Sequence, residues 1–291
     1  MKIAAALIIL LSSIVFGNGE FLEPNCGVSV SSNGNVMPLI FNGRPADMFG
    51  NPWMALIVTT EPNVLRMCGG SLITNRFVLS AGHCTYNSPT DVYLGEFDRS
   101  TITDCSDKAC MPNAIKIAVD AYLKHPKYVH YNQNDITLFR LITPVQFTAY
   151  IKPICLVTDN DVLNYITYMN VTGWGITENR VASQVLMTTT LTKMDRSYCS
   201  HAYGYQVDES HICAWDYTSS ACPGDSGGPL FAKVRISGLD RVVQLGIVSY
   251  GSEQCRGMGV YTNVFYYMNW IKDAIRVGTP NTINNSAAAW K

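Results

Sequence analysis

The sequence predicts an all-β protein whose antiparallel strands form barrels or a sandwich. Short runs rich in Val, Ile, Thr and Tyr recur along the chain, and Gly, Pro, Asn and Asp separate them. Helical segments do not alternate with these runs, as they would around a parallel sheet. A length of 291 residues with 47% apolar residues suffices for one large β domain or two small ones.

The expected strands follow one another along most of the chain. Examples are the runs 56–60, 71–80, 92–97, 136–141, 185–193, 242–249 and 259–264. One helix is expected at 265–276, because Met268, Ile271 and Ile275 recur at helical spacing. Gly278 and Pro280 would end this helix, and the polar segment 278–291 is expected to be a flexible tail.

The first residues predict a secretory signal peptide over 1–19. A basic start, Met1-Lys2, precedes an apolar run at 3–16 and small residues at 17–19. The alternative is a membrane anchor, but the run is shorter than the roughly 20 apolar residues that a span needs. We therefore expect a secreted, extracellular protein with no membrane partner. The formal net charge of −1 argues against nucleic acid as a partner, since duplex binders need a basic face.

Ten cysteines in a secreted chain predict disulfides, because the extracellular space is oxidising. A metal site is the weaker interpretation, since no two C-x-x-C motifs stand at zinc-finger spacing. The cysteines are Cys26, Cys68, Cys84, Cys105, Cys110, Cys155, Cys199, Cys213, Cys222 and Cys255.

One serine lies in a cluster of glycines, Gly224-Asp225-Ser226-Gly227-Gly228-Pro229. Small neighbours let a substrate carbonyl approach the Ser226 hydroxyl and let backbone N–H groups converge on the negative charge that it creates. The pattern Gly-x-Ser-x-Gly is also typical of α/β-hydrolases, in which the catalytic histidine follows the serine. All five histidines of this chain precede Ser226, which excludes that class.

The base must then lie upstream, and His83 is the candidate. It follows the apolar run 77–81 and precedes Cys84, whose disulfide would hold the imidazole rigidly for proton transfer. A lone histidine is more often structural, and His125, before Pro126, fits such a turn position. Asp135 stands at the head of an apolar strand, where its charge needs partners; an ordinary strand-cap aspartate is the alternative interpretation.

These three stretches together resemble the chymotrypsin-like (trypsin-fold) serine proteases, and the order His83, Asp135, Ser226 is the order of that family. The resemblance covers about residues 26–277. Its further anchors are Asn-Pro-Trp at 51–53, Cys-Gly-Gly-Ser-Leu-Ile at 68–73, Thr-Gly-Trp-Gly at 172–175, Ser-Tyr-Gly at 249–251 and Gly-Val-Tyr-Thr at 259–262. It implies two six-stranded antiparallel β-barrels packed together with a C-terminal α-helix, in a protease domain over 40–277. Gly82 stands where alanine is usual in the family.

The resemblance also implies a role for each matching residue. Ser226 would be the nucleophile, His83 the general base and then the general acid, and Asp135 the group that orients His83. The backbone N–H groups of Gly224 and Ser226 would form the oxyanion hole, and Ser249 would support Asp135. No catalytic metal or other cofactor is implied.

The primary specificity pocket of the family would have Ser220 at its floor, six residues before the serine. Tyr250, Gly251 and Gly259 would line it. Tryptic relatives carry aspartate at the floor, whereas Ser220 would give a substrate guanidinium no ion partner. We therefore expect cleavage after bulky apolar residues, unless Asp216 reaches in from the rim and restores some preference for basic ones.

Activation is where the chain departs from the family. The segment Ile40-Phe41-Asn42-Gly43 matches the mature N-terminus, and its new α-amino group would pair with Asp225, a buried acid that needs a cation. The residue before the cut is Leu39 rather than the usual Arg or Lys. We expect a propeptide over 20–39, removed after Leu39 by a protease that prefers apolar or small residues.

The family resemblance also implies how the cysteines pair. The chain resembles secreted serine proteases of arthropods, here without a clip domain. The implied pairs are Cys26–Cys155, which would tether the propeptide, Cys68–Cys84, Cys105–Cys110, Cys199–Cys213 and Cys222–Cys255.

The sequence also contains a loop that could bind calcium and two glycosylation sequons. Some relatives bind calcium in the loop that here holds Glu96, Asp98, Asp104 and Asp107, but residues 113–116 lack an acid to close such a site. Glycosylation sequons begin at Asn170, which we expect in a strand, and at Asn284 in the tail.

The leading hypothesis is an active secreted serine endopeptidase, and the alternative is a catalytically silent homologue that binds or regulates other proteins. No triad residue is missing, whereas Leu39 favours the alternative, because a zymogen that is never cut is inert. The expected partners are protein or peptide substrates, an activating protease and proteinaceous inhibitors of a monomeric enzyme.

Overall fold

The structure of the chain is a computed structural model that describes residues 21–29, 39–107, 109–158, 162–177, 179–236, 238–252, 254–279 and 291, with the backbone alone for 39–43. The expected signal peptide, half of the propeptide and the sequon at Asn284 lie outside these residues. No helix among the described residues is both long and apolar enough to cross a membrane.

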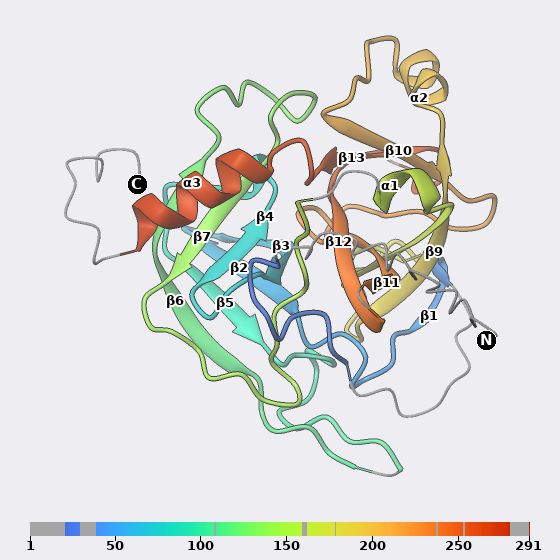
Figure 1. Ribbon diagram of the computed structural model, residues 1–291. Helices are drawn as coiled ribbons and strands as arrows, with labels where there is room; N and C mark the ends of the chain where they lie inside the picture. The colour runs from blue at the N-terminus through green and yellow to red at the C-terminus, as the bar shows by residue number, and fades with distance from the viewer. Residues whose placement is uncertain are drawn as a thin grey trace, which may run out of the picture.

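Six antiparallel strands of the first half close into a barrel (Figure 1), with the neighbour order β2-β3-β4-β7-β6-β5. They are β2 (Met54–Glu61), β3 (Val64–Leu72), β4 (Phe77–Ser80), β5 (Thr90–Leu94), β6 (Ile115–Lys124) and β7 (Thr137–Leu141). A core of apolar side chains fills the barrel, with Leu72, Val78 and Leu138 completely buried.

The second half forms a second barrel, because β8 pairs with both β9 and β11 and so closes the sheet. Its strands are β8 (Tyr168–Gly173), β9 (Met187–Met194), β10 (His211–Trp215), β11 (Pro229–Ile236), β12 (Leu239–Tyr250) and β13 (Gly259–Asn263), and β1 (Leu39–Pro45) adds to β9. The predicted pair of six-stranded antiparallel barrels is therefore confirmed.

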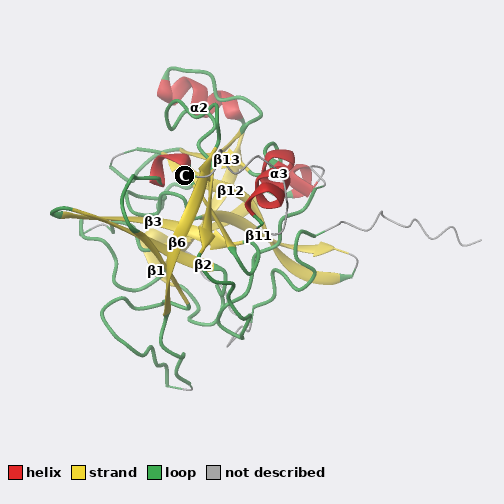
Figure 2. Ribbon diagram, turned by 90° about the vertical axis from the view of Figure 1, so that its left-hand side faces the viewer, coloured by secondary structure: helices red, strands yellow, loops and turns green. Residues whose placement is uncertain are grey.

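Helices are few and peripheral. Helix α3 (Met268–Gly278) places Met268, Ile271 and Ala274 in the core of the first barrel and lies beside β7 (Figure 1). Figure 2 shows the strands as the body of the molecule and α2 (Arg196–Tyr203) at its edge. A short helix, α1 (Val162–Tyr165), precedes β8, and the 3-10 helix η1 (Gly82–Cys84) follows β4.

The expected strand at 71–80 is wrong, because the chain turns within it. The backbone N–H of Ile73 donates to the carbonyl of Phe77, and the Thr74 hydroxyl accepts from the N–H groups of Arg76 and Phe77. Threonine at this position favours a turn over a continuous strand. The run is thus the end of β3 and all of β4, and the helix expected from 265 begins instead at Met268.

The segment 21–29 is fixed to the second barrel although it precedes β1. Cys26 is disulfide-bonded to Cys155, and the Gly27 backbone exchanges hydrogen bonds with Pro153 and Val242. Phe21 packs against the core of the second barrel. A cut between this segment and β1 would therefore leave the segment attached.

Candidate active site

His83 and Asp135 meet between the two barrels. His83 lies in η1 after β4, and Asp135 stands two residues before β7. His83 Nδ1 is 2.8 Å from Asp135 Oδ2, and the His83 backbone N–H donates to Asp135 Oδ1 at 2.9 Å. Because a carboxylate only accepts, Nδ1 carries the proton and Nε2 is left as the basic nitrogen.

Residues of the second barrel complete the surroundings of Asp135, whose side chain is only 1% exposed. The Ser249 hydroxyl, on β12, donates to Asp135 Oδ2 at 2.6 Å. The Thr262 hydroxyl, on β13, donates to the Asp135 backbone carbonyl at 2.8 Å. The buried charge is therefore satisfied by donors from both barrels, so Asp135 is not an ordinary strand cap.

Ser226 lies in a tight turn just before β11. The backbone N–H of Gly228 donates to the Asp225 carbonyl, and the N–H of Gly69 in β3 donates to the Ser226 carbonyl at 2.7 Å. Gly224 and Gly227 have φ angles of 100° and 80°, a region that favours glycine. A side chain at Gly227 would also overlap the Ser80 hydroxyl, so the glycine cluster is required by the turn itself.

The turn brings Ser226 next to Cys84, the residue that follows the histidine. Cys84 Sγ lies 3.7 Å from the Ser226 backbone carbonyl, and Cys84 directly follows His83. Among the described residues, the Ser226 hydroxyl makes no hydrogen bond, and the backbone N–H groups of Gly224 and Ser226 have no acceptor. A serine hydroxyl and two backbone N–H groups without an acceptor thus lie on one turn, which contacts the residue that follows His83.

Asp225 points away from this site into the protein. Its side chain accepts from the backbone N–H groups of Gly175 at 2.8 Å and Cys222 at 2.9 Å. A side chain at Gly173 or Gly175 would overlap the carboxylate. Burial raises the pKa of Asp225 to about 6, and no cation of the described residues pairs with it.

A cavity of about 390 Å³ opens beside Ser226. Ser249, Tyr250, Gly251 and Gly259 line it, as does Pro223, directly before Gly224. The lining residues that sequence reasoning did not place there are Tyr131, Tyr203, Tyr205, Ala221, Cys222, Val248, Ser252 and Tyr261. The rings of Tyr131, Tyr203 and Tyr205 all lie within 5.7 Å of the Tyr250 ring, measured between centroids.

Ser220 and Asp216 do not line this cavity. Ser220 is buried, and its hydroxyl donates to the backbone carbonyl of Ala221. Asp216 accepts hydrogen bonds from the backbone and hydroxyl groups of Thr218 and Ser219. These local bonds hold the Asp216 carboxylate away from the cavity, so the rim acid does not supply a charge there.

Comparison with known proteins decides the family. The Trypsin family model matches residues 40–271, which is most of the chain.

The chain belongs to the trypsin family.

Its relatives are insect serine proteases, and the chain is accordingly a serine-type endopeptidase. It is 37% identical over 254 residues to Serine protease grass of Drosophila melanogaster, covering 81% of this chain and 67% of that protein. It is 35% identical to the Spaetzle-processing enzyme of the same organism, covering 81% of this chain and 66% of that protein. The crystal structure of the Drosophila Grass clip serine protease of the Toll pathway superposes with a TM-score of 0.74 at 34% identity, covering 91% of this chain and 76% of that one.

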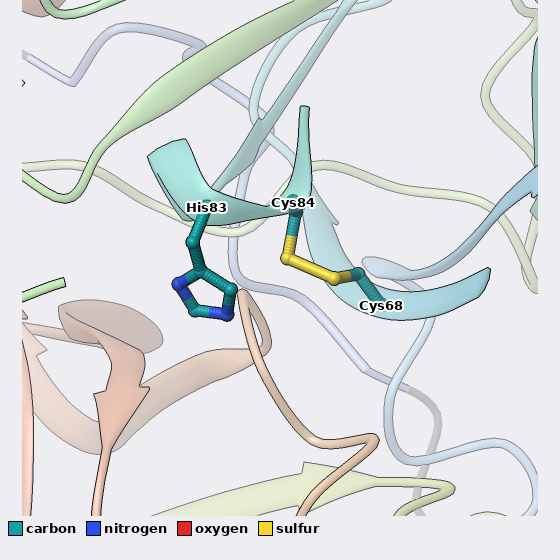
Figure 3. A group of neighbouring side chains, drawn as sticks. All are labelled: Cys68, His83 and Cys84. Atoms are coloured by element: carbon teal, nitrogen blue, oxygen red, sulfur yellow. A yellow bond between two sulfur atoms is a disulfide. The ribbon is translucent and has the colours of Figure 1, made fainter. Parts of the chain in front are cut away.

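Within this trypsin-family domain, one group of potential metal ligands occurs among the described residues: Cys68, His83 and Cys84. Figure 3 shows the two sulfur atoms bonded to each other beside the imidazole. A disulfide has no thiolate to offer, so the group does not bind a metal ion. The disulfide instead ties η1, which carries His83, to β3.

The described residues contain five disulfides, in the pairings that the family resemblance implies. Of the acids considered for calcium, Asp107 lies in the loop closed by Cys105 and Cys110, whereas Glu96, Asp98 and Asp104 precede that loop. Asp104 is nearly buried and accepts from the backbone N–H groups of Phe97 and Asp98 and from the Thr101 hydroxyl. Its oxygens therefore organise the loop backbone.

Proposed function

We propose that the chain is a secreted endopeptidase, made as an inactive precursor, that hydrolyses peptide bonds through Ser226, His83 and Asp135. The observation that carries this proposal is the fixed His83 ring, whose Nδ1 is held by Asp135 at 2.8 Å so that Nε2 is left basic, while the next residue, Cys84, contacts the Ser226 backbone. Asp135 is buried and bonded by Ser249, so the orientation of the ring is set before substrate arrives.

The reaction begins when substrate binding brings the Ser226 hydroxyl to His83 Nε2; such bonds are often unformed without substrate. Ser226 Oγ attacks the substrate carbonyl, and its proton passes to Nε2. The Asp135 carboxylate stabilises the imidazolium, and the N–H groups of Gly224 and Ser226 stabilise the oxyanion. His83 then protonates the leaving amine, and water attacks the acyl-enzyme by the same steps in reverse. These steps need no cofactor, and calcium in the loop of Asp104 has no part in them.

We infer a preference for bulky apolar residues on the acyl side of the cut bond. The cavity beside Ser226 is about 390 Å³, and Gly251 and Gly259 contribute no side chains to fill it. Ser220, which the family resemblance assigns to the pocket floor, is neutral and lies buried directly before the lining residue Ala221. A guanidinium would lose its water there without an ion partner, whereas an aromatic or aliphatic side chain gains from leaving water.

Activation after Leu39 is part of the proposal. Residues 39–45 form strand β1 of a continuous chain, so no α-amino group exists at Ile40 before a cut. Asp225 meanwhile sits fully buried without a cation. A new N-terminus at Ile40 would supply that cation and fix the turn that carries Gly224 and Ser226. Cys26–Cys155 would keep the propeptide attached after the cut.

Secretion and a place in a proteolytic cascade are inferred from the disulfides and the relatives. Five disulfides fit an oxidising compartment. The relatives include a Spaetzle-processing enzyme and a Phenoloxidase-activating factor 3, names that describe action on other proteins. We propose that this chain likewise cuts a protein substrate and is itself activated by another protease.

Labelling with a fluorophosphonate separates this function from a silent homologue. After limited proteolysis, the wild-type protein should label and the Ser226→Ala variant should not, since only an activated serine reacts. N-terminal sequencing of the labelled form should read Ile-Phe-Asn-Gly. Absence of labelling in protein that has been cut at Leu39 would refute the catalytic proposal, and a different N-terminus would refute the activation site.

A further inference from the structure

A second cavity, of about 330 Å³, opens in the second barrel where α1, α2, β9 and β10 come together. Figure 1 shows α1, α2 and β10 at the same end of that barrel. Leu163 of α1, Lys193 of β9, Arg196 of α2 and Glu209 before β10 are among its lining residues. Among the described residues, none lines both this cavity and the one beside Ser226. The catalytic steps therefore leave this cavity without a role.

Lys193 brings a positive charge to the cavity. Its Nζ donates to the backbone carbonyl of Leu163 at 2.6 Å, and an ammonium has three N–H groups, so two are left for a ligand. No acid of the described residues lies within ion-pair distance of Lys193. Burial, and after it the charge of Arg196, lowers the pKa of Lys193. A negatively charged group in the cavity would supply the missing counter-charge.

The other charged residues of the cavity leave it with an excess of positive charge. Arg196 is exposed and, within the described part of the chain, forms no ion pair, because the preceding acid, Asp195, caps α2 by accepting from a backbone N–H. His211 has a partner, since its Nδ1 lies 3.1 Å from the Asp208 carboxylate. Glu209 is exposed and is the one acid among the described lining residues. Two unpaired cations thus stand against one acid.

The remaining lining is largely apolar, and its rim carries exposed aromatic rings. Met194 and Phe265 line the cavity together with Tyr266, which is 53% exposed. Tyr165 is 87% exposed and directly follows the lining residue Asn164. Tyrosine and arginine on an exposed surface are typical of the residues that dominate protein interfaces. The volume is at the small end of ligand pockets, which hold about 300–1,000 Å³, so the cavity suits one or two side chains.

We propose that this cavity is a docking site for a protein partner that presents an acidic segment flanked by apolar residues. An Asp or Glu side chain of the partner would accept hydrogen bonds from Lys193 and Arg196, and its apolar neighbours would pack against Tyr165 and Tyr266. Glu209 would repel the same acid and so limit the affinity. The site is separate from the proposed catalytic function and would bind its partner whether or not Ser226 cuts a peptide bond.

A calorimetric titration of the full secreted chain with Ser226→Ala, which prevents cleavage, tests this site. The probe is a blocked pentapeptide with leucine at both ends and Asp-Glu-Asp between them, and the control peptide has Asn-Gln-Asn instead. We expect the acidic peptide to bind at least about fivefold more tightly than the neutral one, because only the acidic one offers a counter-charge. Raising the salt concentration from about 0.05 M to about 0.5 M should remove most of this difference.

Substitutions of the cavity charges locate the binding and separate it from a folding defect. Lys193→Met and Arg196→Met should each raise the Kd of the acidic peptide about fivefold, the effect of one partly shielded charge pair. Glu209→Gln should lower the Kd about twofold to threefold, because a repulsion is removed, and a misfolded protein would not bind more tightly. Lys272→Met is the matched control, since Lys272 is an exposed cation on α3, and it should leave the Kd unchanged.

Equal affinity for the acidic and neutral peptides, or no change of Kd in Lys193→Met and Arg196→Met, would overturn the docking site. Binding to Glu209→Gln no tighter than to the parent protein would do the same. An equal loss in Lys272→Met would show that net charge alone governs binding, which would also overturn it. A sulfated oligosaccharide that displaces the peptide at lower concentration, with the same dependence on Lys193 and Arg196, would assign the cavity to a glycan and overturn the protein partner.

Discussion

Asp225 should make the uncut chain less stable at neutral pH than at acidic pH. The carboxyl is fully buried, and burial raises its pKa from 3.8 to about 6. The folded chain therefore holds this proton more tightly than the unfolded chain. The resulting stability is fully present below the unfolded pKa and is lost as pH rises through the folded value. A shift of about two units at 1.36 kcal/mol each corresponds to roughly 3 kcal/mol of unfolding free energy.

The measurement compares two urea-denaturation series between pH 4 and pH 7. Both proteins carry Ser226→Ala to prevent self-cleavage, and one also carries Asp225→Asn. The quantity compared is the unfolding free energy of the protein that keeps Asp225 minus that of the protein with Asp225→Asn. We expect this difference to fall by roughly 2–3 kcal/mol as pH rises from 4 to 7. Asp273→Asn is the control, because Asp273 is 68% exposed and should leave the profile unchanged. Parallel profiles with and without the Asp225 carboxyl would refute the reasoning.

The same experiment on processed protein tests activation. A cut after Leu39 that delivers an α-amino group to Asp225 places a cation beside the carboxylate and lowers its pKa. The loss of stability between pH 4 and pH 7 should then shrink or vanish in the cut protein. An unchanged slope after a cut at this bond would show that the new N-terminus does not reach Asp225.

Three further outcomes are expected. Ser226→Ala should fold normally and lose at least about 10⁴-fold in kcat/KM; activity within tenfold of wild type would exclude Ser226 as the nucleophile. Ser220→Asp should raise the ratio of cleavage after Arg to cleavage after Phe about tenfold or more in paired peptides, because the floor gains a charge; an unchanged ratio would refute the assignment of the floor. Replacing Cys26 and Cys155 by serine should cost about 2–5 kcal/mol of stability and release the propeptide from cut enzyme on a non-reducing gel, whereas retention would exclude the tether.

The fold was predictable because its signals are local or belong to the family. Alternating apolar residues mark most strands, and β6 carries this alternation at Ile115, Ile117 and Val119. The error at 71–80 has a local cause too. The Thr74 hydroxyl accepts hydrogen bonds from the backbone N–H groups of Arg76 and Phe77, and the pattern of apolar residues does not predict these bonds.

Much of the site depends on contacts between residues far apart in the chain. Ser249 reaches Asp135 from β12, and the tyrosines of the cavity come from separate loops and strands. No periodicity predicts that Tyr131 and Tyr205 face the same ring of Tyr250.

Two buried aspartates show how similar burial leads to different chemistry. Asp135 is 1% exposed, but its carboxylate receives the His83 ring, the His83 backbone and the Ser249 hydroxyl. Asp225 is equally buried and receives two backbone N–H groups only, which do not offset desolvation. Asp135 can therefore serve in the resting site as it stands, whereas Asp225 remains short of a positive partner. The unpaired carboxylate would be stabilised by the α-amino group of a new N-terminus. The pH dependence of the unfolding free energy, measured before and after the cut, therefore tests whether that pairing forms.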